Sequence, residues 1–370
     1  FFSCHDVRRH GLITIKRARW VIFISICLWS GIFSSYAVFY TAPTPLSCTI
    51  ADLAEYFFAY IGLAILLLGT IGNIINVISF ARLESLKTLA SSLFLLTSFI
   101  GSQCVLITGL LTRVIRGFTR IDPVYASVGL CKARWMIRTT AGAVSLTCIC
   151  LAAIDRYFFS CHDVRRHGLI TIKRARWVIF ISICLWSGIF SSYAVFYTAP
   201  TSLSCTIADP IFAYLVSYFN LFHYSILPLS VLSIFCMLTW HNLGQQPATY
   251  LRGGVRLYDQ VTRMLIAQSV GILITSFPNM IWQIYSVSSQ STRKSSLRLA
   301  QENLINTICV LIGFSTHAIT FYVYLFASST FRKNVKEMLL RNRQIQPLSN
   351  VDIFKITITK PDQRATSAIS

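Results

Sequence analysis

Eight long apolar stretches constrain what this chain can fold into more than any other feature of its sequence. Each has about 20 residues or more, the length that an α-helix needs to cross the hydrocarbon core of a bilayer. Apolar residues make up 54% of the 370 residues and charged residues only 12%, far from the balance of a soluble domain. We therefore predict an all-α, multi-pass membrane protein. The stretches are Trp20–Tyr40, Tyr56–Phe80, Ser91–Leu111, Trp135–Ile154, Trp177–Tyr197, Ile211–Trp240, Val261–Tyr285 and Asn306–Ala327.

The formal net charge of +20 indicates membrane topology rather than nucleic-acid binding. Lysines and arginines gather at the ends of the apolar stretches, as they do on cytoplasmic flanks. We expect anionic membrane lipid and a cytosolic protein to meet them, and no nucleic acid. One group of bases falls on the opposite side and exceeds what this tendency predicts: Arg113, Arg116, Arg120, Lys132 and Arg134.

The twelve cysteines show no spacing typical of a metal site, so we predict no metal. Most stand singly inside apolar stretches, where cysteine behaves as a small apolar residue. Cys48, Cys131 and Cys205 lie instead at stretch ends on the expected oxidising face, where a disulfide is able to form. No paired carboxylates or phosphate-binding loop accompany the scattered histidines, so we expect neither an enzyme nor a cofactor.

The segment "LAAIDRYFFSCHDVRR" places Asp155, Arg156 and Tyr157 at the end of the fourth stretch. An acid beside an arginine at a membrane boundary is costly unless the two are paired or serve a function. Three letters alone are a weak signal, but further landmarks follow in order. Cys131 precedes Arg156 by 25 residues, and Cys205 follows one stretch later. The other landmarks are Gly72, Asn73, Trp186, Pro228, Pro278, and Tyr324 ahead of Phe331.

Together these landmarks resemble those of the rhodopsin-like (class A) G-protein-coupled receptors, with a likeness to invertebrate FMRFamide-type and orphan peptide receptors. The resemblance covers about residues 54–340. It implies a seven-transmembrane helix bundle in the plasma membrane with a cytoplasmic C-terminus. It also implies a neuropeptide-receptor-like function in signal transduction, with an extracellular peptide-like ligand and a heterotrimeric G protein as partners. The alternatives are a membrane transporter or channel and a non-signalling product of a partially duplicated receptor gene.

The resemblance also assigns roles to single residues. Asp155 is expected to hold Arg156 in the resting state, and Arg156 to meet the G protein on activation, with Tyr157 completing the coupling motif. Cys131 is expected to form a disulfide with Cys205. A polar network and hinges inside the bundle are expected at Asn73, Trp186, Pro228, Pro278 and Tyr324. For Trp186, an ordinary lipid-facing aromatic is the alternative.

Arg138 is the main clue to the ligand, because it stands where amine receptors of the family carry an acid. A cation in a poorly solvated pocket repels an ammonium ligand. The position argues against biogenic amines and for a peptide or another ligand with an acidic group. Trp282 and Tyr285 are further candidates for the pocket wall. The alternatives are that Arg138 reaches the outer interface and that both aromatics only pack in the core.

Several positions depart from the family pattern. No acid occurs between Glu84 and Asp122, so the family's intramembrane Asp and its sodium site are missing, and Gly101 or Ser102 stands there. Ser276 replaces the usual tryptophan before Pro278. Thr320 and Phe321 replace the Asn and Pro of the last helix. These departures put sodium modulation and the usual activation switch in doubt.

Residues 1–52 repeat residues 158–209 with one difference, Pro45 against Ser202. The copied piece corresponds to the second cytoplasmic loop, the fourth receptor helix and the outer loop. A working repeat needs diverged packing partners, so we interpret the copy as a recent partial duplication, a gene-model error or a truncated fragment. Its bases precede its apolar run, which is also compatible with a real extra N-terminal span.

The predicted organisation therefore has three parts: the copy (1–52), a seven-helix receptor domain (53–340) and a disordered cytoplasmic tail (341–370). Near the end of the receptor domain, one helical face carries Phe331, Val335, Met338 and Leu339 and the other carries bases. This pattern predicts a short amphipathic helix on the membrane surface after the last span.

Overall fold

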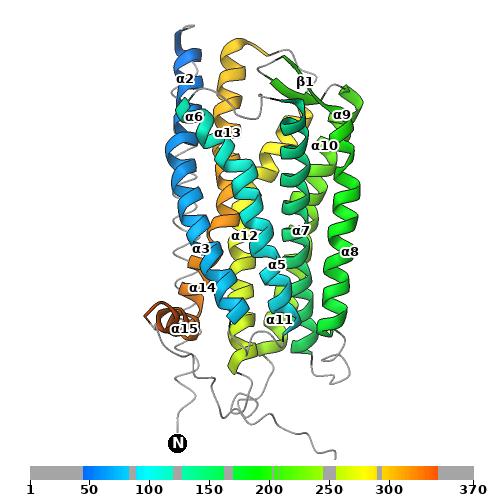
Figure 1. Cartoon of the computed structure of the whole chain (residues 1–370), viewed down its shortest axis with the longest axis vertical. Helices are drawn as coiled ribbons and strands as arrows, with labels where there is room; N and C mark the ends of the chain where they lie inside the picture. The colour runs from blue at the N-terminus through cyan, green and yellow to red at the C-terminus, as the bar shows by residue number, and fades with distance from the viewer. Residues whose placement is uncertain are drawn as a thin grey trace, which may run out of the picture.

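The computed structural model describes residues 45–82, 89–119, 127–161, 170–201, 204–207, 209–244, 256–289 and 294–340. Its long helices stand side by side in a bundle (Figure 1). Within these residues, six helices are long and apolar enough to cross a membrane, and one bent pair makes a seventh. The predicted all-α membrane bundle is thus confirmed. The first predicted span (20–40) and the predicted tail lie outside the described residues.

The seven spans are built from α-helices and three short π-helical turns, labelled η. The elements are α2 (Pro45–Tyr56), η2 (Phe57–Ile61), α3 (Gly62–Arg82), α5 (Ala90–Val105), η3 (Leu106–Leu111), α6 (Thr112–Thr119), α7 (Val128–Ser160), α8 (Ile172–Phe190), α9 (Ser192–Phe196), β1 (Tyr197–Thr201), β2 (Ser204–Ile207), α10 (Pro210–Leu221), η6 (Phe222–Ile226), α11 (Leu227–Gly244), α12 (Arg256–Ser288), α13 (Ser296–Ala318), α14 (Thr320–Ala327) and α15 (Ser329–Leu340).

Several helices begin at a polar side chain that caps their first backbone N–H groups. The side chain of Asp209 accepts a hydrogen bond from the backbone N–H of Ile211 at 2.8 Å, and Pro210 follows at the first helical position of α10, where its missing N–H is no loss. Ser and Thr side chains cap three other helices in the same way: Ser127 for α7, Thr171 for α8 and Ser295 for α13.

The π-helical turn η6 has a cause in the sequence. Pro228 has no N–H, so the carbonyl of Tyr224 lacks its usual helical donor. The backbone adjusts by widening the turn, and the N–H of Leu227 bonds to the carbonyl of Phe222, five residues earlier. The predicted hinge residue Pro228 therefore lies directly beyond a local irregularity of the span. Pro278 lies inside α12.

The outer loop before α10 contains a β-hairpin. Strands β1 and β2 are antiparallel, with Tyr197 opposite Ile207 and Thr198 opposite Thr206. The hairpin lies over one end of the bundle, and α15 lies at the other (Figure 1). We call these the hairpin end and the α15 end.

Four identical residues adopt two different structures in this chain. "SCTI" occurs at 47–50, inside α2, and again at 204–207, where it forms β2. The only difference between the two copies, Pro45, is the first residue of α2, a position that favours proline. After the helical copy, the chain stays helical through η2 into α3, whereas Pro210 follows the other copy and biases Asp209 toward extended backbone. Neighbouring residues therefore decide the local structure.

An aromatic cluster fills the core at the α15 end. Tyr324 contacts three other rings, with centroids 6.1 Å from Phe80, 6.0 Å from Phe99 and 5.8 Å from Phe331, and all four side chains are at most 2% exposed. The predicted amphipathic helix corresponds to α15, and its Phe331 and Val335 are buried in the core of the bundle. The cluster thus fixes α15 against α3, α5 and α14.

The last span bends by 54° between α13 and α14. The bend falls at Ile319, just before Thr320 and Phe321. No proline stands at this point, so the bend does not need the residue that usually breaks a helix.

Gly69 allows α3 to approach α13 closely. A Cβ atom at Gly69 would lie 2.8 Å from the Cβ and 3.1 Å from the Cα of Ala318, and neither atom is able to rotate away. We expect Gly69→Ala to destabilise the protein by about 1–3 kcal/mol through overpacking, measured as a lower thermal unfolding midpoint in detergent.

Gly188 of α8 provides the matched control, because a Cβ there would meet no atom within 4 Å. Gly188→Ala should leave the midpoint unchanged or raise it, since alanine favours the helix. Equal losses in the two variants would contradict the close approach of α3 and α13.

Candidate functional site

Helix α7 runs the length of the bundle and carries predicted site residues near both of its ends (Figure 1). It packs against α5, α8 and α11. Cys131 and Arg138 lie in the part nearer the hairpin end, and Asp155, Arg156 and Tyr157 lie at the α15 end. The two groups are therefore joined by one continuous helix.

The structure brings Asp155 and Arg156 into a buried ion pair. The Nη2 of Arg156 lies 2.6 Å from the Oδ2 of Asp155, and the two residues are 3% and 7% exposed, respectively. The guanidinium also lies over the ring of Phe159, 5.3 Å from its centroid. Breaking such a buried pair by removing one partner is strongly unfavourable. Asp155 thus helps to hold Arg156 in place.

Tyr157 points to a neighbouring helix. Its ring centroid lies 5.5 Å from that of Phe235 in α11. At the end of α7, the Nδ2 of Asn242 donates to the Oγ of Ser160 at 3.1 Å. These contacts tie the end of α7 that carries the ion pair to α11.

A network of neutral polar groups crosses the middle of the bundle. The Oγ of Ser145 in α7 lies 2.9 Å from the Oγ of Ser98 and 3.0 Å from the Oγ of Ser102, both in α5. Ser102 in turn lies 3.0 Å from the Nδ1 of His317 in α13. Asn73 of α3 donates to the backbone carbonyl of His317 at 3.2 Å. Four helices are therefore joined without a carboxylate. Of Gly101 and Ser102, the two candidates for the position of the family's intramembrane Asp, Ser102 is the one that takes part in the network.

A cavity of about 330 Å³ lies between α7, α10, η6, α12 and α13. Arg138 and Trp282, both predicted for a ligand pocket, line it. The guanidinium of Arg138 lies over two aromatic rings, 5.0 Å from Trp135 and 5.7 Å from Phe314. This places the side chain inside the bundle. Neutral amides from α10, α12 and α13 contribute to the same wall: Asn220, Asn279, Gln283 and Asn306.

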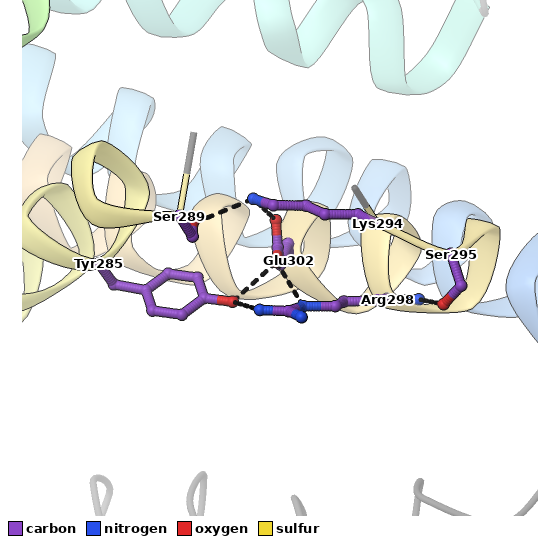
Figure 2. Close-up of polar contacts among 6 residues, drawn as sticks. All are labelled: Tyr285, Ser289, Lys294, Ser295, Arg298 and Glu302. Atoms are coloured by element: carbon purple, nitrogen blue, oxygen red, sulfur yellow. Dashed lines mark hydrogen bonds and ion pairs between the residues drawn. The ribbon is translucent and has the colours of Figure 1, made fainter. Parts of the chain in front are cut away.

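Tyr285, the third residue predicted for the pocket, belongs to an ion cluster at the hairpin end (Figure 2). Its hydroxyl donates to the Oε1 of Glu302 at 2.7 Å. Glu302, only 9% exposed, also binds the Nζ of Lys294 at 2.5 Å and the Nε of Arg298 at 3.1 Å. Lys294 reaches back to Ser289 at 3.1 Å. One carboxylate thus fastens the end of α12 to the start of α13.

Trp186 and Tyr324 both form hydrogen bonds between helices. The Nε1 of Trp186 donates to the Oγ1 of Thr147 in α7 at 3.1 Å, and its ring lies 4.1 Å from that of His223. Trp186 of α8 therefore packs against α7 and η6. The hydroxyl of Tyr324 donates to the Oε1 of Gln268, which links α14 to α12.

Cys131 is fully buried and disulfide-bonded. Its predicted partner, Cys205, lies in β2, but the side chains of Cys205 and Cys48 are outside the described part of the structure, so the pairing stays a prediction. Among the described residues, no group of three or more His, Cys, Asp or Glu side chains lies close enough to hold a metal ion.

Sequence reasoning did not find the Glu302 cluster or the role of His317. The sequence carried a clue to both residues, because an ionisable residue inside an apolar stretch or at its edge is unusual. Glu302 lies just before the stretch Asn306–Ala327 and His317 within it. Their partners come from other helices, at sequence distances that no local pattern reveals.

A family model described as "7 transmembrane receptor (rhodopsin family)" matches residues 72–324 of the chain. The matched part begins in α3, ends in α14 and covers more than half of the chain. It includes the ion pair of α7, the polar network and the cavity. A search of curated proteins gave no match.

The Glu302 cluster leads to a stability prediction. Glu302→Gln keeps the size of the side chain but leaves Lys294 and Arg298 without a counter-charge. We expect the thermal unfolding midpoint in detergent to fall by about 2–4 °C. Glu337→Gln is the matched control, because Glu337 only meets Lys333 at 3.9 Å on the exposed face of α15, where such pairs contribute little. A fall of equal size in the control would argue against the cluster.

The disulfide prediction distinguishes Cys205 from Cys48, which lies at the equivalent position of the repeated segment. Peptide mapping by mass spectrometry without reduction should return Cys131 linked to Cys205, with Cys48 as a free thiol. A Cys131–Cys48 peptide would contradict the assignment.

Proposed function

Because the chain belongs to the rhodopsin family of seven-transmembrane receptors, we propose that it binds an extracellular, peptide-like ligand at the hairpin end and activates a heterotrimeric G protein at the α15 end. Family membership gives the chain a signalling role as a multi-pass membrane receptor. The FMRFamide-type likeness, the peptide nature of the ligand and the coupling residues belong to the proposal.

The orientation is supported by the disulfide of Cys131. Disulfides persist in oxidising surroundings such as the cell exterior, and Cys131 lies at the hairpin end. The α15 end, with the C-terminus beyond it, then faces the cytoplasm. The exposed bases Lys333 and Lys336 of α15 would there meet anionic lipid of the inner leaflet.

The Asp155–Arg156 pair is the observation that carries the proposal. It is buried, charge-assisted and formed within one helix, so Arg156 has a resting partner whose loss is costly. A G-protein segment that offers Arg156 new acceptors would stabilise a second state of the bundle. A ligand that binds this second state more tightly shifts the equilibrium toward it.

The connection between the two ends follows from helices that reach both. On α7, Arg138 and Arg156 are separated by roughly 27 Å at 1.5 Å per residue. Helix α12 lines the cavity, contains Pro278 and is bonded to Tyr324 through Gln268. A ligand that moves α12 relative to α7 would therefore act on the region around Arg156.

The peptide-like character of the ligand is supported by the cavity wall. Neutral amides such as Asn220, Asn279 and Gln283 match the donors and acceptors of a peptide backbone. Trp135, Trp282 and Phe314 provide apolar surface beside them. This combination of apolar walls with a few placed polar groups is typical of ligand sites.

The coupling role is tested with purified G proteins of each Gα class and membranes that contain the receptor. Asp155→Asn removes the negative charge that holds Arg156, so we expect ligand-independent nucleotide exchange to rise roughly tenfold. Arg156→Ala should abolish receptor-stimulated exchange while the amount of receptor at the cell surface stays the same.

Arg176→Ala is the control, because Arg176 is an exposed arginine near the start of α8, at the α15 end of the bundle. The Arg176→Ala receptor should stimulate nucleotide exchange on the G protein as strongly as the unmodified receptor. If the Arg156→Ala receptor also stimulates exchange normally, coupling does not depend on the Asp155–Arg156 pair.

A further inference from the structure

Arg138 is a cation in the cavity whose counter-charge does not come from the described residues. Among these residues, the cavity lining contains no carboxylate, and Arg138 forms no ion pair or hydrogen bond. An ionisable side chain within a membrane span is costly unless it is paired or serves a function. The partner of Arg138 must then come from outside this part of the chain.

The side chain of Arg138 is surrounded by residues of three elements, α7, α13 and η3, and we call this surrounding its seat. Its guanidinium lies over Trp135 of α7 and Phe314 of α13. On the third side is Gly109 in η3, where a Cβ atom would lie 3.0 Å from both the Cδ and the Nε of Arg138. The missing side chain of Gly109 therefore makes room for Arg138. Its position is fixed before any ligand arrives.

The guanidinium of Arg138 forms no hydrogen bond with the described residues, so its N–H donors are available to a ligand. These five donors lie in one plane, in a fixed fork. This planar fork matches two oxygens of a carboxylate or a similar oxyanion and binds them with two parallel hydrogen bonds. An ammonium group would be repelled.

Two further polar atoms of the cavity have no partner. The Oδ1 of Asn220 and the Oε1 of Gln283 are buried and accept no hydrogen bond from the described residues. Both residues line the same cavity as Arg138. They are acceptors, so a complementary ligand carries N–H donors as well as an oxyanion. A peptide with an acidic side chain or a free C-terminal carboxylate has both.

Charge at the hairpin end favours the same ligand. In the Glu302 cluster, Lys294 and Arg298 share one carboxylate, which leaves one positive charge in excess. One turn from Arg138, the Nε of Arg134 donates to the backbone carbonyl of Thr108 at 3.2 Å, so a second guanidinium lies near the cavity. Positive charge at the mouth of a cleft raises the local concentration of an anion.

We propose that the cavity recognises its ligand through an oxyanion, a carboxylate in a peptide, which binds the guanidinium of Arg138 while Asn220 and Gln283 accept N–H groups. The proposal rests on the proposed function only in taking this cavity as the ligand site. It names the ligand's chemical class and the residue that selects it.

The test measures the electrostatic selectivity of the cavity and needs no ligand and no G protein. Ser217→Cys introduces a thiol of nearly the same shape in the cavity lining. Two methanethiosulfonate reagents of similar size are then applied in separate reactions, and the rate of each is measured. One reagent carries a sulfonate and the other a trimethylammonium group. Each converts the thiolate into a mixed disulfide and releases methanesulfinate. The background rate of the chain without the added cysteine is subtracted.

The ratio of the sulfonate rate to the trimethylammonium rate is the readout. We expect it to exceed the ratio for free cysteine, and to fall about tenfold or more when Arg138→Gln is added. Arg138→Lys should keep the high ratio, because the charge remains. Arg134→Gln, the same change of charge one turn away, should lower it far less.

Several results would overturn the proposal. One is a ratio in the Ser217→Cys receptor at or below that of free cysteine, which needs no Arg138 variant. Another is an unchanged ratio in Arg138→Gln when a neutral reagent reacts at its normal rate and so reports an intact cavity. Arg134→Gln with the same loss as Arg138→Gln is a third. Failed nucleotide exchange with retained anion selectivity would reject the coupling proposal alone.

Discussion

Within a bilayer, every backbone N–H and C=O must find its partner inside the protein, and the rest of this structure follows from that requirement. Seven helical spans satisfy it along almost all of their length. Where Pro228 removes a donor, η6 widens to supply another pairing, and the last span bends at Ile319 while the helix resumes at once in α14. The β-hairpin, whose outer backbone edges are not paired within its two strands, lies at one end of the bundle (Figure 1).

The same surroundings weaken the hydrophobic effect as a force between helices, because lipid tails are as apolar as leucine. Close approach and hydrogen bonds take its place. Gly69 brings α3 against α13, and Ser98, Ser102 and Ser145 join α5 to α7. Charges contribute as well, among them the buried Asp155–Arg156 pair at the α15 end, the cluster around Glu302, and Arg138 in the cavity. The scarcity of carboxylates in the described spans fits a receptor rather than a transporter that carries ions through the membrane.

How much of this was predictable depends on the range of the interaction. Span length and the amphipathic face of α15 are encoded in residues close together in the sequence, so the bundle and the short amphipathic helix after its last span were expected. Asp155 and Arg156 are neighbours, and their pairing needs no knowledge of the fold. By contrast, Glu302 and His317 find partners on other helices, and those contacts depend on how the helices rotate and pack. Tyr285 was expected in the cavity but lies in the Glu302 cluster for that reason.

The segment "SCTI" shows the same dependence on surroundings within one molecule. These four residues are helical in α2 and extended in β2, so their intrinsic preferences do not decide between the two structures. Pro45 and the continuation through η2 into α3 favour the helix, and Pro210 favours the strand. The chain thereby holds an internal calibration of conformational context: four letters that do not determine their own secondary structure. A method that assigns structure from short windows must misjudge at least one of the two copies, and its error there measures how far it looks along the chain.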